Sequence, residues 1–369
     1  MSKKILELCM SPDLGGLELY FLRLSEYLHK EGEVFAIVNE KSKLLERVTK
    51  AQLPYKSYKR AKGLSTLFLA KKIAKLVDEE QIDLIHIHWT KDILLAVLVK
   101  LFSKHTPKLV QTRHMRITRF KDDVYHRFIY KNVDAIIGVT KQVKEQLERF
   151  IPSDIAPMIE NIYIGAAEVS LIEEQKRAEL RQEYGLDNAF TLGIVGRIEE
   201  AKGQKVLIDA LSTLEKQGLK DIKLLIVGHT MDESYLKGLQ EYVKSLGLES
   251  SVIFTGFSSE VQNLMQICDL IVLATENETF GLVLIEAMQA GIAVLGSDKG
   301  GPLEIIEDGK SGVLFESLNS MDLAQKIATL YKFPQLREAM ALRGQQRAKE
   351  LFDDTKQFEE VKKMLESLV

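Results

Sequence analysis

Short apolar runs alternate with longer segments of helical periodicity along almost the whole chain. The runs predicted as strands are, in the first half, Lys4–Cys9, Glu33–Val38, Asp83–His88, Lys108–Thr112 and Asp134–Val139, and, in the second half, Thr191–Gly196, Lys223–Gly228, Val252–Thr255, Leu270–Ala274, Ala293–Gly296 and Gly312–Phe315. Segments between them, such as Leu17–Lys30 and Ile93–Phe102, repeat apolar residues at helical spacing. Apolar strands separated by amphipathic helices predict parallel sheets covered by helices on both faces.

The same pattern predicts two domains and a final helix. It lapses at 152–170, where Pro152, Pro157 and Gly165 interrupt the chain. We therefore expect an N-terminal domain over 1–168 and a C-terminal domain over 169–352. The segment 353–369 carries a helical pattern with no strand after it. The fold class is α/β, with two doubly wound domains facing a cleft, because ligands of such sheets bind at the carboxyl ends of the strands.

Composition indicates a soluble globular protein in a reducing compartment. Of 369 residues, 46% are hydrophobic and 28% charged. The two cysteines, Cys9 and Cys268, lie inside apolar runs, which excludes a disulfide framework and a thiolate zinc site. The apolar run after Lys3 and Lys4 is too short for a signal peptide, and Ile93–Phe102 is too short to cross a bilayer. We expect a cytoplasmic protein.

Charge is distributed unevenly between the two halves. Residues 1–168 hold 28 Lys/Arg against 21 Asp/Glu, and residues 169–369 hold 22 against 32. Within the first half, 56–75 holds basic residues and no acid, and 104–131 is also rich in Lys and Arg. One hypothesis is that this surface rests on anionic lipid at the inner face of the plasma membrane or binds a phosphorylated glycolipid. The alternative is a solvated basic face. Nucleic acid is not an expected partner.

The loop and helix after the strand Leu270–Ala274 carry the most informative chemistry. Free amides at Phe280, Gly281 and Leu282 would point out of the helix start, where the helix dipole favours an anion. Glu278 in the loop suits hydrogen bonds from sugar hydroxyls, and Glu286 in the helix suits those from a ribose. The alternative is a solvated loop before an ordinary helix. Because Glu286 lies among apolar residues, we favour the binding site.

Two further clusters follow strands. Arg197 and Lys202, after Thr191–Gly196, form a phosphate grip that needs no metal; taken singly, each is more often a surface charge. Gly15 and Gly16, after the first strand, match neither a Walker loop nor the dinucleotide fingerprint. Adjacent glycines at a helix start still cradle phosphate in many proteins, although they also make simple tight turns.

Three histidines lie at strand ends. His114 follows Lys108–Thr112 and is expected to face the cleft, whereas His88 is expected to support the packing. His86 and His88 alternate along one strand. A metal site there would need an acidic partner, and the sequence suggests none, so no metal is expected.

Together these residues resemble the retaining GT-B glycosyltransferases of group 1, or family 4. The resemblance rests on Glu278 and Glu286 eight residues apart within Glu-Thr-Phe-Gly-Leu, on Gly196-Arg197 and Lys202-Gly203, on Gly15-Gly16, and on the strand-end histidines. It spans nearly the whole chain and is most specific in 190–316. It implies two Rossmann-like domains, of which the first binds acceptor and the second binds the nucleotide sugar. It also implies that the final helix packs back on the first domain.

The resemblance further implies roles and a reaction. Arg197 and Lys202 would bind the diphosphate, Glu286 the ribose and Glu278 the donor sugar, with His114 near the reacting sugar. The expected activity is metal-independent hexosyl transfer, with retention, from a UDP- or GDP-linked sugar to a glycan or glycolipid such as lipopolysaccharide. No cofactor is expected. A nucleotide-sugar epimerase and a non-catalytic sugar- or partner-binding subunit remain as alternatives on the same fold.

Overall fold

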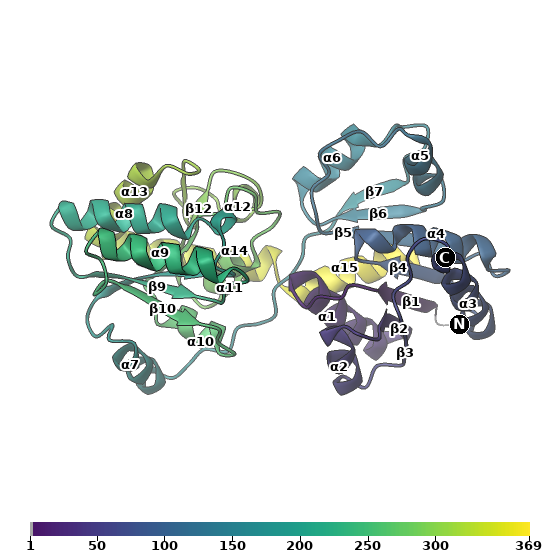
Figure 1. The fold of residues 1–369 in the computed structure, drawn as a ribbon, viewed down its shortest axis with the longest axis horizontal. Helices are drawn as coiled ribbons and strands as arrows, with labels where there is room; N and C mark the ends of the chain where they lie inside the picture. Colours follow the sequence, from purple (N-terminus) through teal and green to yellow (C-terminus); the bar gives the residue numbers. More distant parts are fainter. Residues whose placement is uncertain (1–2) are drawn as a thin grey trace. The chain divides into compact units, whose positions relative to one another are not determined.

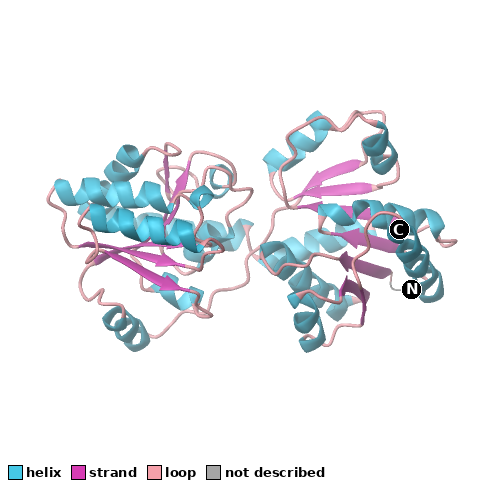
Figure 2. Cartoon of the chain, in the orientation of Figure 1, coloured by secondary structure: helices cyan, strands magenta, loops and turns pink. Residues whose placement is uncertain are grey.

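The structure is a computed structural model that describes residues 3–369 and divides into two compact units. Unit 1 comprises the chain up to Ile164 together with Thr355–Val369, and unit 2 comprises Gly165–Asp354. The divisions thus fall after residues 164 and 354, a few residues from the expected 168 and 352. Each unit is a parallel sheet with helices on both faces, as the strands lying between helices in Figure 2 show.

Unit 1 is built on a seven-stranded sheet in the order β3-β2-β1-β4-β5-β6-β7. Its strands are β1 Lys4–Cys9, β2 Glu33–Asn39, β3 Tyr55–Tyr58, β4 Leu84–Ile87, β5 Lys108–Arg113, β6 Ala135–Gly138 and β7 Met158–Asn161. Its helices are α1 Gly16–Glu31, α2 Lys43–Lys50, α3 Ser65–Glu80, the 3-10 turn η1 Thr90–Asp92, α4 Ile93–Phe102, α5 Val124–Tyr130, α6 Lys141–Phe150 and the terminal α15 Asp354–Glu366. The strand order reverses between β1 and β4, the position at which doubly wound sheets bind ligands.

Unit 2 repeats the scheme with six strands in the order β10-β9-β8-β11-β12-β13. The strands are β8 Phe190–Val195, β9 Ile222–Val227, β10 Val252–Gly256, β11 Leu270–Leu273, β12 Ala293–Ser297 and β13 Val313–Phe315. The helices are α7 Glu174–Glu183, η2 Glu200–Lys202, α8 Gln204–Lys216, α9 Glu233–Ser245, α10 Val261–Gln266, α11 Leu282–Gln289, α12 Pro302–Ile305, α13 Ser320–Lys332 and α14 Pro334–Leu351. Here the order reverses between β8 and β11.

Every strand expected from the sequence is present, with each end within one residue of its expected place. Two strands were missed. They are β3 and β7, the edge strands of the unit 1 sheet, which are half-buried to exposed along their length and carry no continuous apolar run. The segment 152–170, where the periodicity lapses and the domain boundary was expected, therefore includes the strand β7.

The terminal helix α15 packs within unit 1 beside α1, as Figure 1 shows by its yellow ribbon along the purple one. The ring of Phe358 meets those of Tyr20 and Tyr27, with centroids 5.6 Å apart in both pairs. The Tyr27 hydroxyl donates to Glu359, at 2.7 Å, and Lys362 pairs with Glu31 at 3.2 Å. The chain end is thus held by a buried aromatic contact with polar contacts around it.

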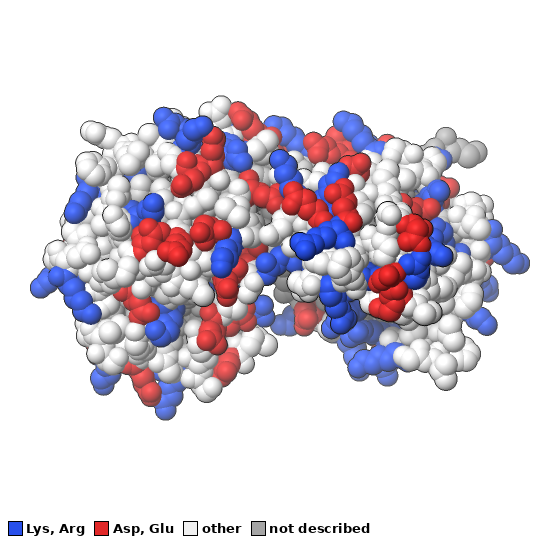
Figure 3. Space-filling model, turned by 90° about the horizontal axis from the view of Figure 1, so that it is seen from above, with Lys and Arg blue, Asp and Glu red and all other residues white. Residues whose placement is uncertain are grey.

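The surface of both units carries the two signs of charge side by side on the face drawn in Figure 3. Several exposed ion pairs join neighbours along a helix, such as Lys75 with Glu79, and contribute little to stability. No helix in the described part of the chain combines the length and apolar character needed to cross a membrane.

Candidate active site

In unit 2, glycines bring two strand-end loops into contact. Gly196 lies directly after β8 and has φ 147°. Gly228 lies directly after β9, and a Cβ added to it would lie 1.9 Å from the carbonyl oxygen of Gly196. A Cβ on Gly203 would lie 2.3 Å from the carbonyl oxygen of Ala274. Only glycine permits such approaches. The loop after β8 is therefore pressed against the end of β11, which carries Lys202 to the loop that follows.

The contact between these loops is an ion pair. The Lys202 ammonium lies 3.0 Å from Oε2 of Glu278, and the two side chains are 27% and 21% exposed. The Thr275 hydroxyl donates to the carbonyl of Ala201 at 2.7 Å and fixes the same junction. Two of the residues predicted from separate motifs are thus in direct contact. Arg197 is 58% exposed, and its guanidinium pairs with Glu199 at 3.3 Å.

A second pair of glycines holds the Glu278 loop from the other side. Added Cβ atoms on Gly300 and Gly301 would lie 2.2 Å from the carbonyl oxygen of Glu278 and 1.8 Å from that of Phe280. The Gly301 amide donates to the Glu278 carbonyl at 3.0 Å. The loop backbone is therefore fixed before any ligand binds. The sequence reasoning missed Gly300 and Gly301, although a Gly-Gly pair in the loop after a strand was the signal used for Gly15 and Gly16.

Helix α11 starts where the sequence predicts. Gly281 is its N-cap with φ 109°, which favours glycine, and the amides of Gly281 and Leu282 donate to no acceptor within residues 3–369. Phe280 is buried and its ring meets that of Phe352, with centroids 5.8 Å apart, so its side chain anchors the loop. Glu286 lies in the second turn and is half-buried. This end of unit 2 therefore offers a lysine, an arginine and free amides to an anion.

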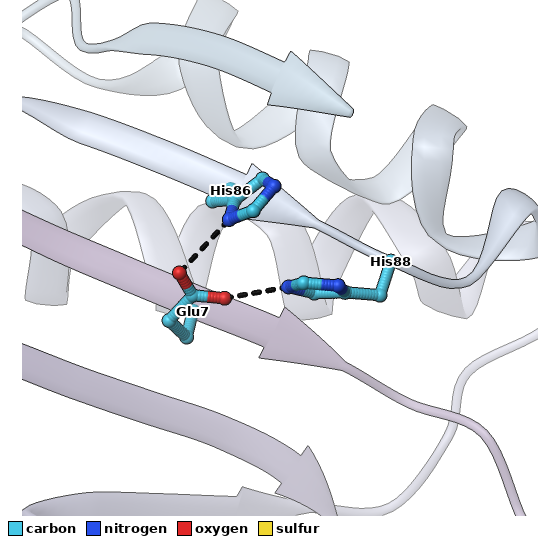
Figure 4. Close-up of side chains that lie close together, drawn as sticks. All are labelled: Glu7, His86 and His88. Atoms are coloured by element: carbon cyan, nitrogen blue, oxygen red, sulfur yellow. Dashed lines mark hydrogen bonds and ion pairs between the residues drawn. The ribbon is translucent and has the colours of Figure 1, made fainter. Parts of the chain in front are cut away.

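In unit 1, Glu7 joins His86 and His88 in a buried network (Figure 4). Glu7 lies on β1 opposite His86 on β4, and one carboxylate oxygen accepts from Nδ1 of His86 at 2.9 Å. The other accepts from Nε2 of His88 at 2.7 Å, and Nε2 of His86 lies 2.8 Å from the Thr112 hydroxyl. All three side chains are fully buried. The expectation that these histidines have no acidic partner is wrong, because the partner comes from a strand about 80 residues away.

The members of this network shift one another's pKa values. Burial raises the pKa of Glu7, but the charges and hydrogen bonds of His86 and His88 outweigh it and lower the value to about 2. Burial, with the neighbouring His86, lowers the pKa of His88 to about 4. The nearest ligand atoms of Glu7, His86 and His88 lie within 4.8 Å of one another. A carboxylate with two imidazoles is a set of ligands that binds metal ions in other proteins. Because both carboxylate oxygens already accept hydrogen bonds, we interpret the group as a buried hydrogen-bonded network rather than a metal site, with Nδ1 of His88 as its one ring nitrogen without a partner within residues 3–369.

His114 lies where β5 ends, beside this network. Its ring is 5.8 Å from that of His88 and 5.1 Å from that of Tyr20, and its Nε2 is buried without a hydrogen-bond partner. Burial, together with the neighbouring His88, His86 and Arg113, lowers the pKa of His114 well below its usual value. His114 is thus a neutral imidazole with one ring nitrogen uncommitted. His88 supports it by packing.

Gly15 and Gly16 begin α1 as expected, but Gly15 already has an anionic partner. Its amide donates to Oε2 of Glu18 at 2.8 Å, and Glu18 is buried. A carboxylate in the first turn is the ordinary way to satisfy a helix start. A phosphate at Gly15 would have to displace it.

Asp92 is a buried acid close to the end of β1, and it supports a prediction about pH. Its Oδ2 accepts from the amide of Met10 at 2.8 Å, and burial raises its pKa to about 7 although the Met10 amide and the Arg60 charge lower it. Asp92→Asn keeps the acceptor and removes the charge. Because the folded pKa exceeds the unfolded one, wild type loses stability as pH rises from about 4 to 7. We expect the variant to be more stable at pH 8 by up to about 4 kcal/mol.

Urea unfolding of wild type and Asp92→Asn at pH 8 and pH 4.5 tests this expectation. The difference between them should nearly vanish at pH 4.5, where the wild-type side chain is protonated. A variant that is less stable than wild type at pH 8 would show that the carboxylate is stabilising in its ionised form.

Comparison with known proteins agrees with this architecture. The model of the glycosyl transferases group 1 matches residues 176–347, and that of Glycosyltransferase Family 4 matches residues 14–161. N-acetyl-alpha-D-glucosaminyl L-malate synthase of Bacillus anthracis is 27% identical over 297 residues, 79% of this chain and 76% of that protein. N-acetylgalactosamine-N,N'-diacetylbacillosaminyl-diphospho-undecaprenol 4-alpha-N-acetylgalactosaminyltransferase of Campylobacter jejuni is 27% identical over 304 residues, 80% of this chain and 79% of that protein.

The fold is also that of solved structures. Anabaena Alr3699/HepE, crystallised in complex with UDP, superimposes with a TM-score of 0.87 at 24% identity, covering 99% of this chain and 100% of that one. The two parallel sheets with their flanking helices are therefore the GT-B fold. The chain belongs to the group 1, or family 4, glycosyltransferases, and it is a glycosyltransferase.

Proposed function

We propose that the chain transfers a hexose-type sugar, with retention, from a UDP- or GDP-linked donor bound in unit 2. The observation that carries the proposal is the Lys202–Glu278 pair at 3.0 Å beside the free amides of α11. Lys202, Arg197 and the amides of Phe280, Gly281 and Leu282 would hold the diphosphate, which needs no metal ion for charge balance. Glu286 would accept from the ribose and Glu278 from the donor sugar. Unit 1 would bind the acceptor.

The chemistry follows from where charge develops. As the anomeric C–O bond breaks, negative charge grows on the β-phosphate, and fixed donors there stabilise the transition state more than the ground state. Glu278 is held by an ammonium at 3.0 Å, which suits a hydrogen-bond acceptor better than a nucleophile. Retention by front-face attack, with the acceptor hydroxyl entering on the side of the leaving diphosphate, is the mechanism we propose. His114 would contribute a neutral imidazole near the reacting sugar. Gly15 and Gly16 would line the phosphate side, with the phosphate taking the place of the Glu18 carboxylate at the Gly15 amide.

The acceptor class we propose is an anionic glycan or glycolipid of the cell envelope, lipopolysaccharide included. The Bacillus anthracis relative is named for L-malate, and the Campylobacter jejuni relative for a diphospho-undecaprenol. Both compounds are anionic at neutral pH. The basic segments of unit 1 are the feature of this chain that suits such an acceptor.

A donor screen tests the proposal. UDP, GDP and ADP at millimolar concentration are added to the whole chain, and the unfolding midpoint is measured for each. A rise with UDP or GDP is expected, followed by sugar transfer from the matching donor when an acceptor mixture is present. Isomerisation of the donor without acceptor would indicate an epimerase. No rise with any nucleotide would refute the donor site and favour a binding subunit.

We also propose that unit 1 rests on an anionic membrane surface through α3 and the end of α4. Leu64 and Phe68 are 78% and 76% exposed, and Leu101 and Phe102 are also exposed. The Lys71 ammonium lies 5.6 Å from the Phe102 ring centroid, so apolar and basic side chains share this surface. Exposed apolar residues among lysines are typical of membrane-surface binding.

Flotation with phosphatidylglycerol vesicles checks this proposal. Wild type should float at low salt, and the double variant Leu64→Ser, Phe68→Ser should float at least about tenfold less, because two apolar side chains no longer enter the interface. Met231→Ser is the matched control, since Met231 is 79% exposed in unit 2. Equal flotation of the double variant and the control would contradict the proposal.

A further inference from the structure

An aromatic ring with two cations beside it lies at the carboxyl end of the unit 1 sheet. Trp89 follows β4 by two residues, and the Arg60 guanidinium carbon lies 4.4 Å from its ring centroid. The Lys91 ammonium lies 5.2 Å from the same centroid. Arg60 and Trp89 are half-buried and Lys91 is exposed. Two cations held by one ring place positive charge at a fixed position.

The guanidinium of Arg60 is oriented but its donors are unused. Within residues 3–369, none of its N–H groups donates a hydrogen bond and no carboxylate pairs with it. The acid that Arg60 influences most clearly is Asp92, which lies beyond ion-pair distance, and burial raises the pKa of Asp92 to about 7. Asp92 therefore compensates the charge of Arg60 only in part at neutral pH. A stacked guanidinium with all five donors open matches the oxygens of a phosphate or carboxylate.

The loop that carries Trp89 is tied to the loop that carries His114. The Arg113 guanidinium donates to the Thr90 hydroxyl at 3.1 Å and to the carbonyl of Met115 at 2.9 Å. Arg113 is buried, so this link is part of the fold. The cations at Trp89 thus lie at the same strand ends as His88 and His114, where a doubly wound sheet binds its ligand.

We infer that Arg60, Trp89 and Lys91 form an anion subsite that takes a phosphate or carboxylate group. Its place in the acceptor site rests on the proposed function, whereas its affinity for anions does not. Arg60 supplies a bidentate fork, Lys91 supplies a second charge, and the Trp89 ring keeps the fork in place. A cation–ring pair that served stability alone would not need open donors.

Trp89 is the single tryptophan of the chain, so its fluorescence reports on this subsite alone. The whole chain is titrated with inorganic phosphate, pyrophosphate and malate at constant ionic strength, and in a separate arm with phosphatidylglycerol vesicles. Wild type should show a saturable change in emission. Arg60→Gln should weaken binding about ten- to a hundredfold, because charge-assisted hydrogen bonds are lost. Lys91→Gln, which keeps the stacked guanidinium, should weaken it by a smaller factor.

Arg149→Gln is the matched control, because Arg149 stacks on Phe150 at 5.3 Å elsewhere in unit 1. It should bind as wild type does. A response to soluble anions that Arg60→Gln loses supports a subsite for a phosphate or carboxylate of the acceptor. A response to vesicles alone, again lost in Arg60→Gln, supports the subsite and assigns it to a lipid headgroup. No saturable response, or an equal one in Arg60→Gln, would overturn the inference. None of these readings needs donor turnover, so they stand apart from the test of the proposed function.

Discussion

Lys202→Ala is expected to lower kcat for sugar transfer by about 10²- to 10³-fold, the usual effect of removing one fixed donor from a developing negative charge. Lys202 lies in a loop held against β11 by glycine contacts, so its charge is in place before the donor binds. Removing it also leaves the Glu278 carboxylate, 21% exposed, without its cation next to the position proposed for the diphosphate. The measurement is steady-state transfer with the donor identified by thermal shift, together with nucleotide affinity.

Lys205→Ala is the control for this prediction. Lys205 lies three residues further along, is 56% exposed, and pairs with Asp209 at 3.0 Å on the face of α8. It should keep full activity, which would show that the loss of one nearby positive charge does not by itself lower kcat. Unchanged kcat and nucleotide affinity in Lys202→Ala would show that the diphosphate does not bind at this loop.

The strands that could be predicted from the sequence are those covered by helices on both faces of the sheet. Central strands such as Ile222–Val227 are apolar at nearly every position, because both faces of a parallel sheet are covered. The edge strands Tyr55–Tyr58 and Met158–Asn161 lack that signal, since they pair on one side only and half their surface is open. Helical periodicity similarly identified α15 as a helix. Its contacts with Tyr20 and Tyr27 depend on chain positions more than 300 residues away.

Those site residues could be predicted that follow one another closely in the sequence after a single strand. Arg197 and Lys202 follow β8, and Glu278 and Gly281 follow β11, so each motif is local in the sequence. The contact between Lys202 and Glu278 required only the knowledge that β8 and β11 are neighbours. Glu7 was missed because its partners are distant along the chain. The available signal was a single acid within the apolar strand Lys4–Cys9, which must be paired if it is buried.

Glu7→Ala is expected to destabilise unit 1 by about 3–5 kcal/mol, the usual cost of removing one partner from a buried charged network. The substitution leaves N–H groups of His86 and His88 buried without an acceptor, in addition to a cavity. Equilibrium urea unfolding at pH 7 measures the change. Glu33→Ala is the matched control on the neighbouring strand. Glu33 pairs with Lys4 at 2.9 Å but is 56% exposed, so its loss should cost less than about 1 kcal/mol.

The pH dependence separates the charge of Glu7 from its packing. The folded pKa of about 2 lies below the unfolded value of 4.5, so the stability contributed by ionised Glu7 is fully present above pH 4.5 and is lost as pH falls toward 2. That loss amounts to roughly 3 kcal/mol. The difference in free energy of unfolding between wild type and Glu7→Ala should therefore decrease as the pH falls from 4.5 to 2.5. The part of the difference that is due to the cavity should remain. A gap that stays constant over this range would mean that Glu7 contributes through packing alone and that its carboxylate is not held ionised by the two histidines.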